Sequence, residues 1–254
     1  MEKTCESVVS QTYQDFEWIV IDGGSNQKTL DIINNYKERI DILVSEKDSG
    51  IYNAMNKGII LASGEYCQFL NAGDYYFNKN SLQKVAGHLS QSDIVFGDLK
   101  FLEPNGNSYI KKFPNKIPYG WLFFDSLPHP SSFIKKELFQ KHGLYNEEHK
   151  IVSDWEKWVE LIDVAKCSYK HIPVLVAVHN HKGISATESD LHINERAEVL
   201  TKYYGSSTYE EVKSKKYIKF LGVPIIKIAK KFDTTHYYFL GIPFYKKIHG
   251  QKQF

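Results

Sequence analysis

Acidic and amide side chains follow three short apolar runs near the start of the chain. They are Asp22 at the end of residues 16–22, Glu46 and Asp48 after residues 41–45, and Asn71 and Asp74 at and after the end of residues 64–71. If these runs are parallel strands, their carboxyl ends meet at one edge of a sheet, where ligands of open α/β sheets gather. Oxygen ligands from one or two carboxylates suit Mg²⁺ or Mn²⁺ when substrate phosphates and water complete the coordination. The pattern therefore predicts a site for a metal-bound phosphate, with Asp74 as its anion.

Each candidate residue also has a local explanation. Residues 71–74 have the composition of a turn, and Asp22 favours an Asx turn. Asp48 precedes a predicted helix and Asp154 lies at the start of another, so each could serve as a helix cap worth about 1 kcal/mol. His129, between two prolines, is typical of a loop. From the residues alone, these alternatives stay open.

Strands that alternate with helices of about a dozen residues must position these side chains. Such alternation implies βαβ units and an α/β fold with a mostly parallel sheet flanked by helices. We expect helices over 2–11, 30–40, 51–63, 153–165 and 189–204, strands over 16–22, 41–45, 64–71, 93–101 and 167–181, a hairpin over 101–113 around Asn105-Gly106, and an aromatic loop over 117–133.

The charge of the chain is unevenly distributed. The 254 residues have a formal net charge of +2, but residues 211–254 carry +8 and the rest −6. "FLGVPIIK" (220–227) recurs as "FLGIPFYK" (239–246), which predicts two short extended or hairpin units. We expect a main domain over 1–205 and a basic, aromatic appendage over 206–254. Its lysines suit an anionic membrane surface, although a solvated appendage or a dimerisation arm fits the same composition.

The three cysteines, Cys5, Cys67 and Cys167, are widely spaced and form no CxxC motif. This favours reduced thiols in a cytoplasmic protein over a disulfide framework or a zinc site. No signal peptide opens the sequence, and no uncharged apolar run approaches 18 residues. We expect a cytoplasmic protein, with peripheral contact to the inner face of the plasma membrane through residues 211–254. The charge balance does not indicate a nucleic-acid partner.

Three segments carry a resemblance to a known family. They are "SVVSQTYQDFEWIVIDGGS", "SEKDSGIYNAMNKGIILASGEYCQFLNAGD" and "VSDWEKW". Together they resemble a family 2 glycosyltransferase of the GT-A fold, over roughly residues 2–185. The resemblance implies transfer of a sugar, with inversion and a divalent cation (Mg²⁺ or Mn²⁺), from a nucleotide-sugar, most plausibly a UDP-sugar. The acceptor would be a glycan or a polyprenyl-linked molecule in bacterial surface polysaccharide assembly.

The resemblance also assigns roles to residues. Asp154 matches the base that activates the acceptor, and Asp22 matches the residue that contacts the nucleotide base. Asn71 to Asp74 take the place of the Asp-x-Asp-Asp motif, where Asn71 and Gly73 replace two carboxylates and leave Asp74 to hold the metal. Further polar residues match the donor pocket or its surroundings, namely Glu46, Asp48, Asn56 and His129, and a histidine at 179 or 181 could reach the metal or the diphosphate.

The resemblance further implies a strand before residue 2, and we expect that strand to be missing, so that its neighbours lack a partner. Two other functions stay open. The replaced carboxylates at 71 and 73 also fit a GT-A domain that binds nucleotide-sugar or membrane without catalysis. The basic residues 211–254 also fit a polyanion-binding protein.

Overall fold

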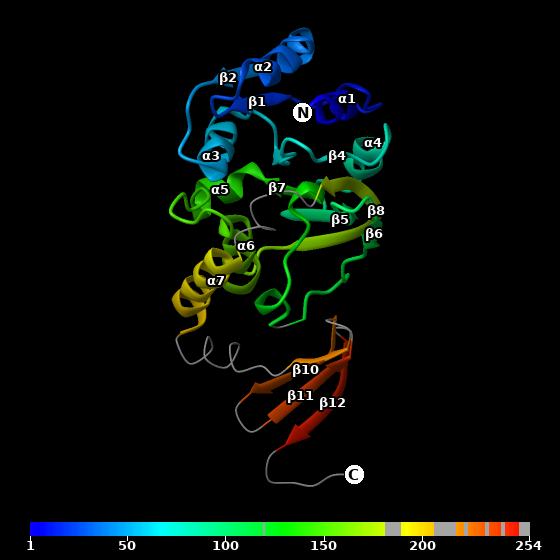
Figure 1. Cartoon of the computed structure of the whole chain (residues 1–254), viewed down its shortest axis with the longest axis vertical. Helices are drawn as coiled ribbons and strands as arrows, with labels where there is room; N and C mark the ends of the chain where they lie inside the picture. Colours follow the sequence, from blue (N-terminus) through cyan, green and yellow to red (C-terminus); the bar gives the residue numbers. More distant parts are fainter. Residues whose placement is uncertain are drawn as a thin grey trace. The chain divides into compact units, whose positions relative to one another are not determined.

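The computed structural model describes residues 1–118, 120–180 and 189–205, together with four strands between 217 and 248. The chain divides into two compact units, Met1–Glu195 and Arg196–Phe254 (Figure 1). The predicted boundary at 205/206 stays a prediction. The helices are α1 (Glu2–Val9), α2 (Gln27–Asn34), α3 (Ile51–Leu61), α4 (Ser81–Ala86), α5 (Lys136–His142), α6 (Ser153–Trp158) and α7 (Ser189–Tyr204), with short helices η1 (Lys37–Arg39), η2 (Trp121–Phe123), η3 (His129–Ser131) and η4 (Val159–Val164).

A mixed sheet of six strands forms the centre of the first unit. Its strands are β3 (Tyr66–Cys67), β4 (Tyr75–Tyr76), β5 (Ile94–Leu102), β6 (Ser108–Lys111), β7 (Ser132–Lys135) and β8 (Tyr169–Asn180). They lie in the order β3-β7-β5-β8-β4, and β6 also pairs with β5. The central strand β5 runs parallel to β8 and antiparallel to β7.

The α/β class is as predicted, but the sheet is mixed where a mostly parallel one was expected. The parallel pair β5–β8 is connected through α5 and α6, as a helical crossover requires. In contrast, β7 follows an irregular segment over 112–131 and β4 follows the turn at 71–74. Neither is preceded by a crossover helix, and both pair antiparallel to their neighbours.

A separate parallel pair, β1 (Ile19–Asp22) and β2 (Ile42–Ser45), holds the first predicted strand ends. Its register places Asp22 opposite Ser45, so two polar residues lie together at the carboxyl end. α2 begins with Asn26, whose side-chain oxygen accepts a hydrogen bond from the Thr29 amide at 3.1 Å, a regular helix cap. Within the described residues, β1 pairs only with β2.

Two local predictions have different outcomes. The hairpin around Asn105-Gly106 is confirmed, because β5 and β6 pair antiparallel and Gly106 adopts the positive φ of 86° that the turn needs. The single helix over 153–165 is wrong in its second half. α6 ends at Trp158, and η4 continues as a π-helix, whose wider turn was not visible in the apolar spacing.

The core lies where β5, β8 and α6 meet. Gly97 of β5 allows close approach of β8, since a Cβ there would contact the Val174 carbonyl oxygen and lie 2.6 Å from Val176 Cγ2. Trp155 and Trp158 of α6 are buried. Other large side chains that are fully buried are Phe96, Ile94, Leu99, Leu122, Phe139, Leu161 and Ile172.

The second unit contains an antiparallel sheet in the order β12-β11-β10-β9. Its strands are β9 (Tyr217–Phe220), β10 (Val223–Lys231), β11 (Thr234–Phe239) and β12 (Ile242–Ile248). The two sequence repeats occupy equivalent places, because Phe220 pairs with Val223 across β9–β10 and Phe239 pairs with Ile242 across β11–β12. This confirms the predicted hairpin units.

No helix in the described part of the chain has the length and hydropathy of a membrane span.

Candidate functional site

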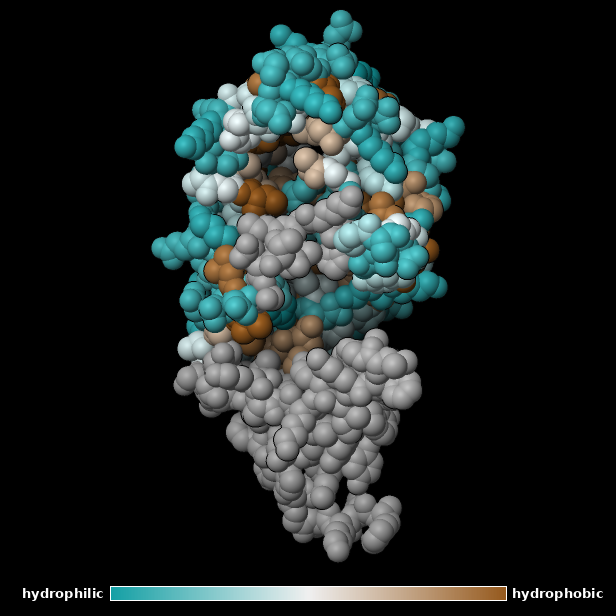
Figure 2. Space-filling model, viewed as in Figure 1, coloured by the Kyte–Doolittle hydropathy of each residue, from teal (hydrophilic) through white to brown (hydrophobic). Residues whose placement is uncertain are grey.

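A cleft of about 1430 Å³ is lined on one side by β1 and on the other by β3 and the segment that follows it. It is lined by four of the side chains that the strand-end pattern predicted to converge, Asp22, Asp48, Asn71 and Asp74. Apolar residues of α1 and α3 form much of the remaining wall. Figure 2 shows this hollow in the upper part of the view. The structure therefore brings three separate segments to one concave surface, the usual form of a small-molecule site.

Asp22 is buried at the carboxyl end of β1. The Ser45 hydroxyl donates to its Oδ2 at 2.8 Å, and the Gly24 and Ser25 amides donate at 3.3 Å. Burial alone would raise the pKa of Asp22, but these hydrogen bonds outweigh it and hold the pKa below its ordinary value. Asp22 thus forms the local turn that its residue type predicted and also lines the cleft.

Asp48 packs against Gly23, the residue after Asp22. Its Oδ1 accepts a hydrogen bond from the Gly50 amide at 3.0 Å, immediately before α3. Its carboxylate lies so close to Gly23 that a Cβ at position 23 would be 2.6 Å from Asp48 Cγ. A side chain at position 23 would therefore displace the Asp48 carboxylate from its place in the cleft wall.

Two predicted donor-pocket residues lie elsewhere in the described part of the chain. Glu46 is exposed and forms an ion pair with Lys57 at 2.6 Å. Asn56 is buried, and its amide binds the backbone N–H and carbonyl of Tyr145, each at 2.9 Å, as well as Glu147. These contacts make Asn56 a support for the segment at 145–147, and its donor contact stays a prediction.

Asp74 is held in place by the end of β8. Its Oδ1 accepts a hydrogen bond from the Asn180 amide at 2.9 Å, and His179 Nδ1 lies 3.0 Å from Oδ1. The Asp74 amide donates to the Asn71 carbonyl, and Gly73 adopts a positive φ of 104°. The turn at 71–74 is therefore real, and it directs a buried carboxylate toward a histidine that the sequence places 105 residues away.

The donor set around Asp74 fits a divalent cation that shares its shell with a substrate. A carboxylate and an imidazole nitrogen lie within 3.1 Å of each other, and Asn180 Oδ1 is buried without a hydrogen-bond partner among the described residues. No group of three or more histidine, cysteine or acidic side chains that could bind a metal occurs in the part that the structure describes. The remaining ligands would come from phosphate and water, as is usual for Mg²⁺.

Asp154 does not cap its helix. The N-cap of α6 is Val152, and no side-chain capping bond is made there. Instead, Asp154 Oδ1 lies 2.9 Å from the hydroxyl of Tyr52 on α3. Sequence reasoning missed Tyr52, although it lies within the segment "GIYNAMNKG" that carried the resemblance.

His129 is a buried histidine of η3. Its Nε2 lies 2.9 Å from the Tyr145 hydroxyl, and its ring stacks on Phe69 at a centroid distance of 5.1 Å. Burial lowers the pKa of His129, while the negative charges of Asp154 and Asp74 oppose this effect. His129 is therefore a neutral residue within the electrostatic reach of both the predicted base and the predicted metal ligand.

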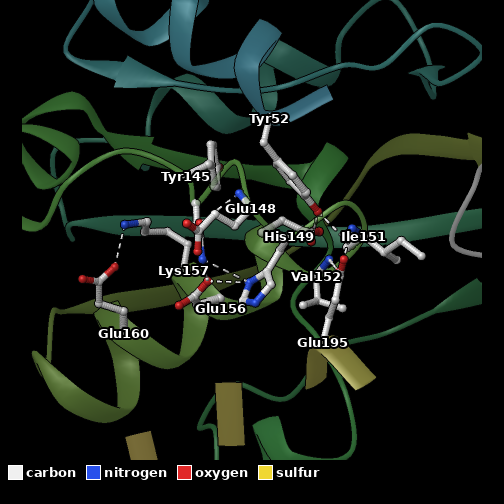
Figure 3. A network of polar contacts seen from close by, with 12 residues as sticks. Tyr52, Tyr145, Glu148, His149, Ile151, Val152, Glu156, Lys157, Glu160 and Glu195 are labelled. Carbon is white, nitrogen blue, oxygen red and sulfur yellow. Dashed lines mark hydrogen bonds and ion pairs between the residues drawn. The ribbon is translucent and has the colours of Figure 1, made fainter. Parts of the chain in front are cut away.

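A polar network precedes α6 and connects it to α3 and α7 (Figure 3). The Glu195 carboxylate accepts hydrogen bonds from the amides of residues 150–152 at 2.7, 2.9 and 3.2 Å. Next to it, His149 Nδ1 lies 2.9 Å from Glu156 Oε2. The network fixes the turn from which Asp154 projects.

An aromatic segment adjoins the same helix. The Trp155 indole N–H donates to the Leu122 carbonyl at 2.7 Å and so anchors η2 against α6. Leu122 is fully buried, whereas Trp121 and Phe123 on either side of it are half-buried.

Comparison of the sequence with known proteins identifies one protein family. The model described as "Glycosyl transferase family 2" matches residues 1–142. A PGL/p-HBAD biosynthesis glycosyltransferase of Mycobacterium bovis is 31% identical over 208 residues, which are 78% of each chain. An uncharacterized glycosyltransferase of Methanocaldococcus jannaschii is 29% identical over 64% of this chain and 59% of its own.

Solved structures agree on the fold. TarS 1–349 of S. aureus in complex with UDP-GlcNAc aligns with a TM-score of 0.58 at 16% identity, covering 82% of this chain and 65% of TarS 1–349. The mannosyltransferase PcManGT of Pyrobaculum calidifontis, in complex with GDP-Man and Mn²⁺, aligns with a TM-score of 0.56 at 17% identity, covering 82% and 59%. The chain thus spans slightly less than two thirds of each of these structures. Their likeness confirms the predicted GT-A fold.

Proposed function

We propose that this chain, which belongs to glycosyl transferase family 2, transfers a sugar from a nucleotide-sugar to an acceptor hydroxyl with inversion at the anomeric carbon. One observation carries the proposal. A cleft is lined by Asp22, Asp48 and Asp74, and the charge of Asp74 and that of Asp154, a separately anchored carboxylate, both act on the buried His129. A donor site next to a general base is what such a transfer requires.

The donor would occupy the cleft. Asp22 and Asp48 would receive the nucleoside, because the carboxylate of Asp22 stays ionised and can accept hydrogen bonds from base or ribose. Asp74 and His179 would hold Mg²⁺ or Mn²⁺, which neutralises the charge that develops on the leaving diphosphate. Asn71 adds a neutral oxygen and amide beside them.

The base would act from the opposite side of the sugar. Asp154 takes the proton of the acceptor hydroxyl while that oxygen forms a bond to the anomeric carbon. The bond between this carbon and the phosphate oxygen breaks, and its electron pair leaves with the nucleoside diphosphate. His129 and Tyr145 are buried and hydrogen-bonded to each other, and burial lowers the pKa of His129, so that we expect neither side chain to compete with Asp154 for the proton.

The donor and the acceptor are proposed as classes. We propose a UDP-sugar as donor and a glycan or polyprenyl-linked acceptor of surface polysaccharide assembly. This is supported by the name of the M. bovis relative, a PGL/p-HBAD biosynthesis glycosyltransferase, and by the complex of the structural neighbour TarS 1–349 with UDP-GlcNAc. We also propose a cytoplasmic location with peripheral contact to the inner leaflet through residues 211–254. That contact predicts salt-sensitive binding to vesicles containing phosphatidylglycerol and none to pure phosphatidylcholine.

A donor panel tests the function. The full chain is incubated with UDP-GlcNAc, UDP-glucose and GDP-mannose, with and without Mn²⁺, and release of the nucleoside diphosphate is measured. Asp154→Asn and Asp74→Asn should each reduce turnover at least about 100-fold. Glu137→Gln, an exposed carboxylate on α5, serves as the matched control and should retain it.

Other outcomes separate the alternatives. Full activity of Asp154→Asn would contradict the assignment of the base. Binding of UDP without turnover of any donor would favour a catalytically inactive binding module.

A further inference from the structure

The hydroxyl of Tyr52 lies between two acceptors. It is 2.9 Å from Asp154 Oδ1 and 2.7 Å from the Ile151 carbonyl oxygen. We infer that Tyr52 is a positioning residue that orients the Asp154 carboxylate, in a turn that Glu195 holds in place. This inference rests on the proposed role of Asp154 as the general base.

Tyr52 can only donate toward Asp154. Its side chain is buried, and burial together with the nearby charge of Asp154 raises the pKa of Tyr52 well above its ordinary value. The hydroxyl therefore keeps its single proton throughout any assay range. That proton lies within hydrogen-bond distance of Asp154 Oδ1 and of the Ile151 carbonyl oxygen, so the hydroxyl joins the carboxylate to the turn that precedes α6.

The same contact selects one oxygen of the carboxylate. Tyr52 occupies Oδ1, so Oδ2 is left as the oxygen that meets the acceptor hydroxyl. A carboxylate that is already oriented loses no rotational freedom on the way to the transition state, so the activation free energy is lower.

Glu195 of α7 holds the turn that precedes α6, to which Tyr52 is also hydrogen-bonded. Its buried carboxylate accepts hydrogen bonds from the backbone N–H groups of Lys150, Ile151 and Val152. Ile151 is thus held by its N–H from α7 and by its carbonyl from α3 (Figure 3). Since α6 begins two residues later, movement of this turn would move Asp154.

The other titratable groups facing Asp154 do not imitate this effect. Tyr145, on the segment after α5, also has a pKa well above its ordinary value because of burial and the charge of Asp154. His129, on η3, has its pKa lowered by burial and is neutral near pH 7. Among the described neighbours, Tyr52 is the one whose hydroxyl contacts the carboxylate.

The test compares Tyr52→Phe with Tyr169→Phe, a control outside the cleft that also removes one tyrosine hydroxyl hydrogen-bonded to the backbone, at the Ile117 N–H. Full-chain protein labelled with ¹³C-aspartate is followed by NMR, with the Asp154 carboxyl resonance assigned by its loss in Asp154→Asn. In Tyr52→Phe this resonance should leave its wild-type position and kcat should fall about tenfold at an unchanged donor KM, because the carboxylate is no longer held in one orientation. Tyr169→Phe should change neither the resonance nor kcat.

Glu195→Gln tests the turn separately from the Tyr52 hydroxyl. Because Glu195 acts only through the backbone, its variant should lower kcat about tenfold and speed amide exchange at residues 150–152. An unchanged Asp154 resonance in Tyr52→Phe would overturn the inference for Tyr52, and unchanged amide exchange in Glu195→Gln would overturn it for the turn. Both readouts work without turnover, so failure of the proposed function is detected separately, by full activity of Asp154→Asn.

Discussion

Alanine at position 97 should destabilise the central strand pair of the first unit. Gly97 lies on β5 between the fully buried Phe96 and the buried Asp98. A Cβ there would contact the Val174 carbonyl oxygen and lie 2.6 Å from Val176 Cγ2, whereas ordinary contact begins at 3.4 Å. The two strands would have to separate by about 0.8 Å to accept one methyl group, in a core packed at crystalline density.

The expected loss of stability depends on which atoms the new methyl group would contact. Overpacking typically costs about 1–3 kcal/mol, and an obstacle formed by backbone cannot rotate away, so we expect about 3 kcal/mol. For a chain of this size each kcal/mol lowers Tm by roughly 2–4 °C, which gives a decrease of about 6–12 °C. Turnover should also fall, because the end of β8 carries His179 and Asn180, which hold Asp74.

Thermal unfolding followed by circular dichroism measures the effect. Gly87→Ala is the matched control, because a Cβ at position 87 would meet no atom within 4 Å and its φ of −66° suits any residue. If Gly97→Ala melted within about 2 °C of Gly87→Ala, the close approach of β5 and β8 would not be the constraint that we infer.

Three further outcomes are expected. Gly23→Ala should displace the flexible Asp48 carboxylate and raise the donor KM about tenfold at unchanged Tm; an unchanged KM would remove Asp48 from the donor site. The pKa of Asp22 is lower in the fold than its ordinary value, so its charge stabilises the protein above that ordinary value and this stability is lost as pH falls through the lowered pKa. In urea unfolding, wild type should therefore exceed Asp22→Asn in stability by more at pH 6 than at pH 3, and an equal difference at both would contradict the assignment. Burial raises the pKa of the Cys67 thiol to about 11, so iodoacetamide at pH 8 should label Cys67 only after unfolding in urea, as peptide mass spectrometry would detect; rapid labelling of the native protein would refute this.

The strand ends of the site could be predicted from the sequence because their signal is local. Asp22 and Asp48 each follow a short apolar run, and parallel pairing of β1 and β2 brings them together without further information. Asp74 was predicted in the same way. Its partner His179 was considered as one of two histidines, but nothing local distinguished it from His181.

The supports of the base could not be predicted in this way. Tyr52 contacts a turn 99 residues away, and Glu195 contacts one about 45 residues away. Tyrosine and glutamate are both common on helix surfaces, so nothing in the sequence distinguishes these two positions from other helical residues. The antiparallel pairing of β7 with β5 could not be predicted for a related reason. The irregular segment before β7 has no helical periodicity, so the sequence does not indicate in which direction β7 joins the sheet.

Helix α3 contacts the cleft through some residues and the segments around Tyr145 and Ile151 through others, and this limits which substitutions the helix can accept. Ala54 and Met55 face the cleft, while Tyr52 holds the turn of the base and Asn56 holds the segment at Tyr145. A helix moves as one body, so the proposed donor pocket and the turn before the proposed base share one support. We therefore expect donor preference and turnover to be linked: a substitution at Ala54 or Met55 that makes room for a different sugar should also shift Tyr52. Directed evolution toward a new donor would then need compensating changes on the opposite face of the same helix.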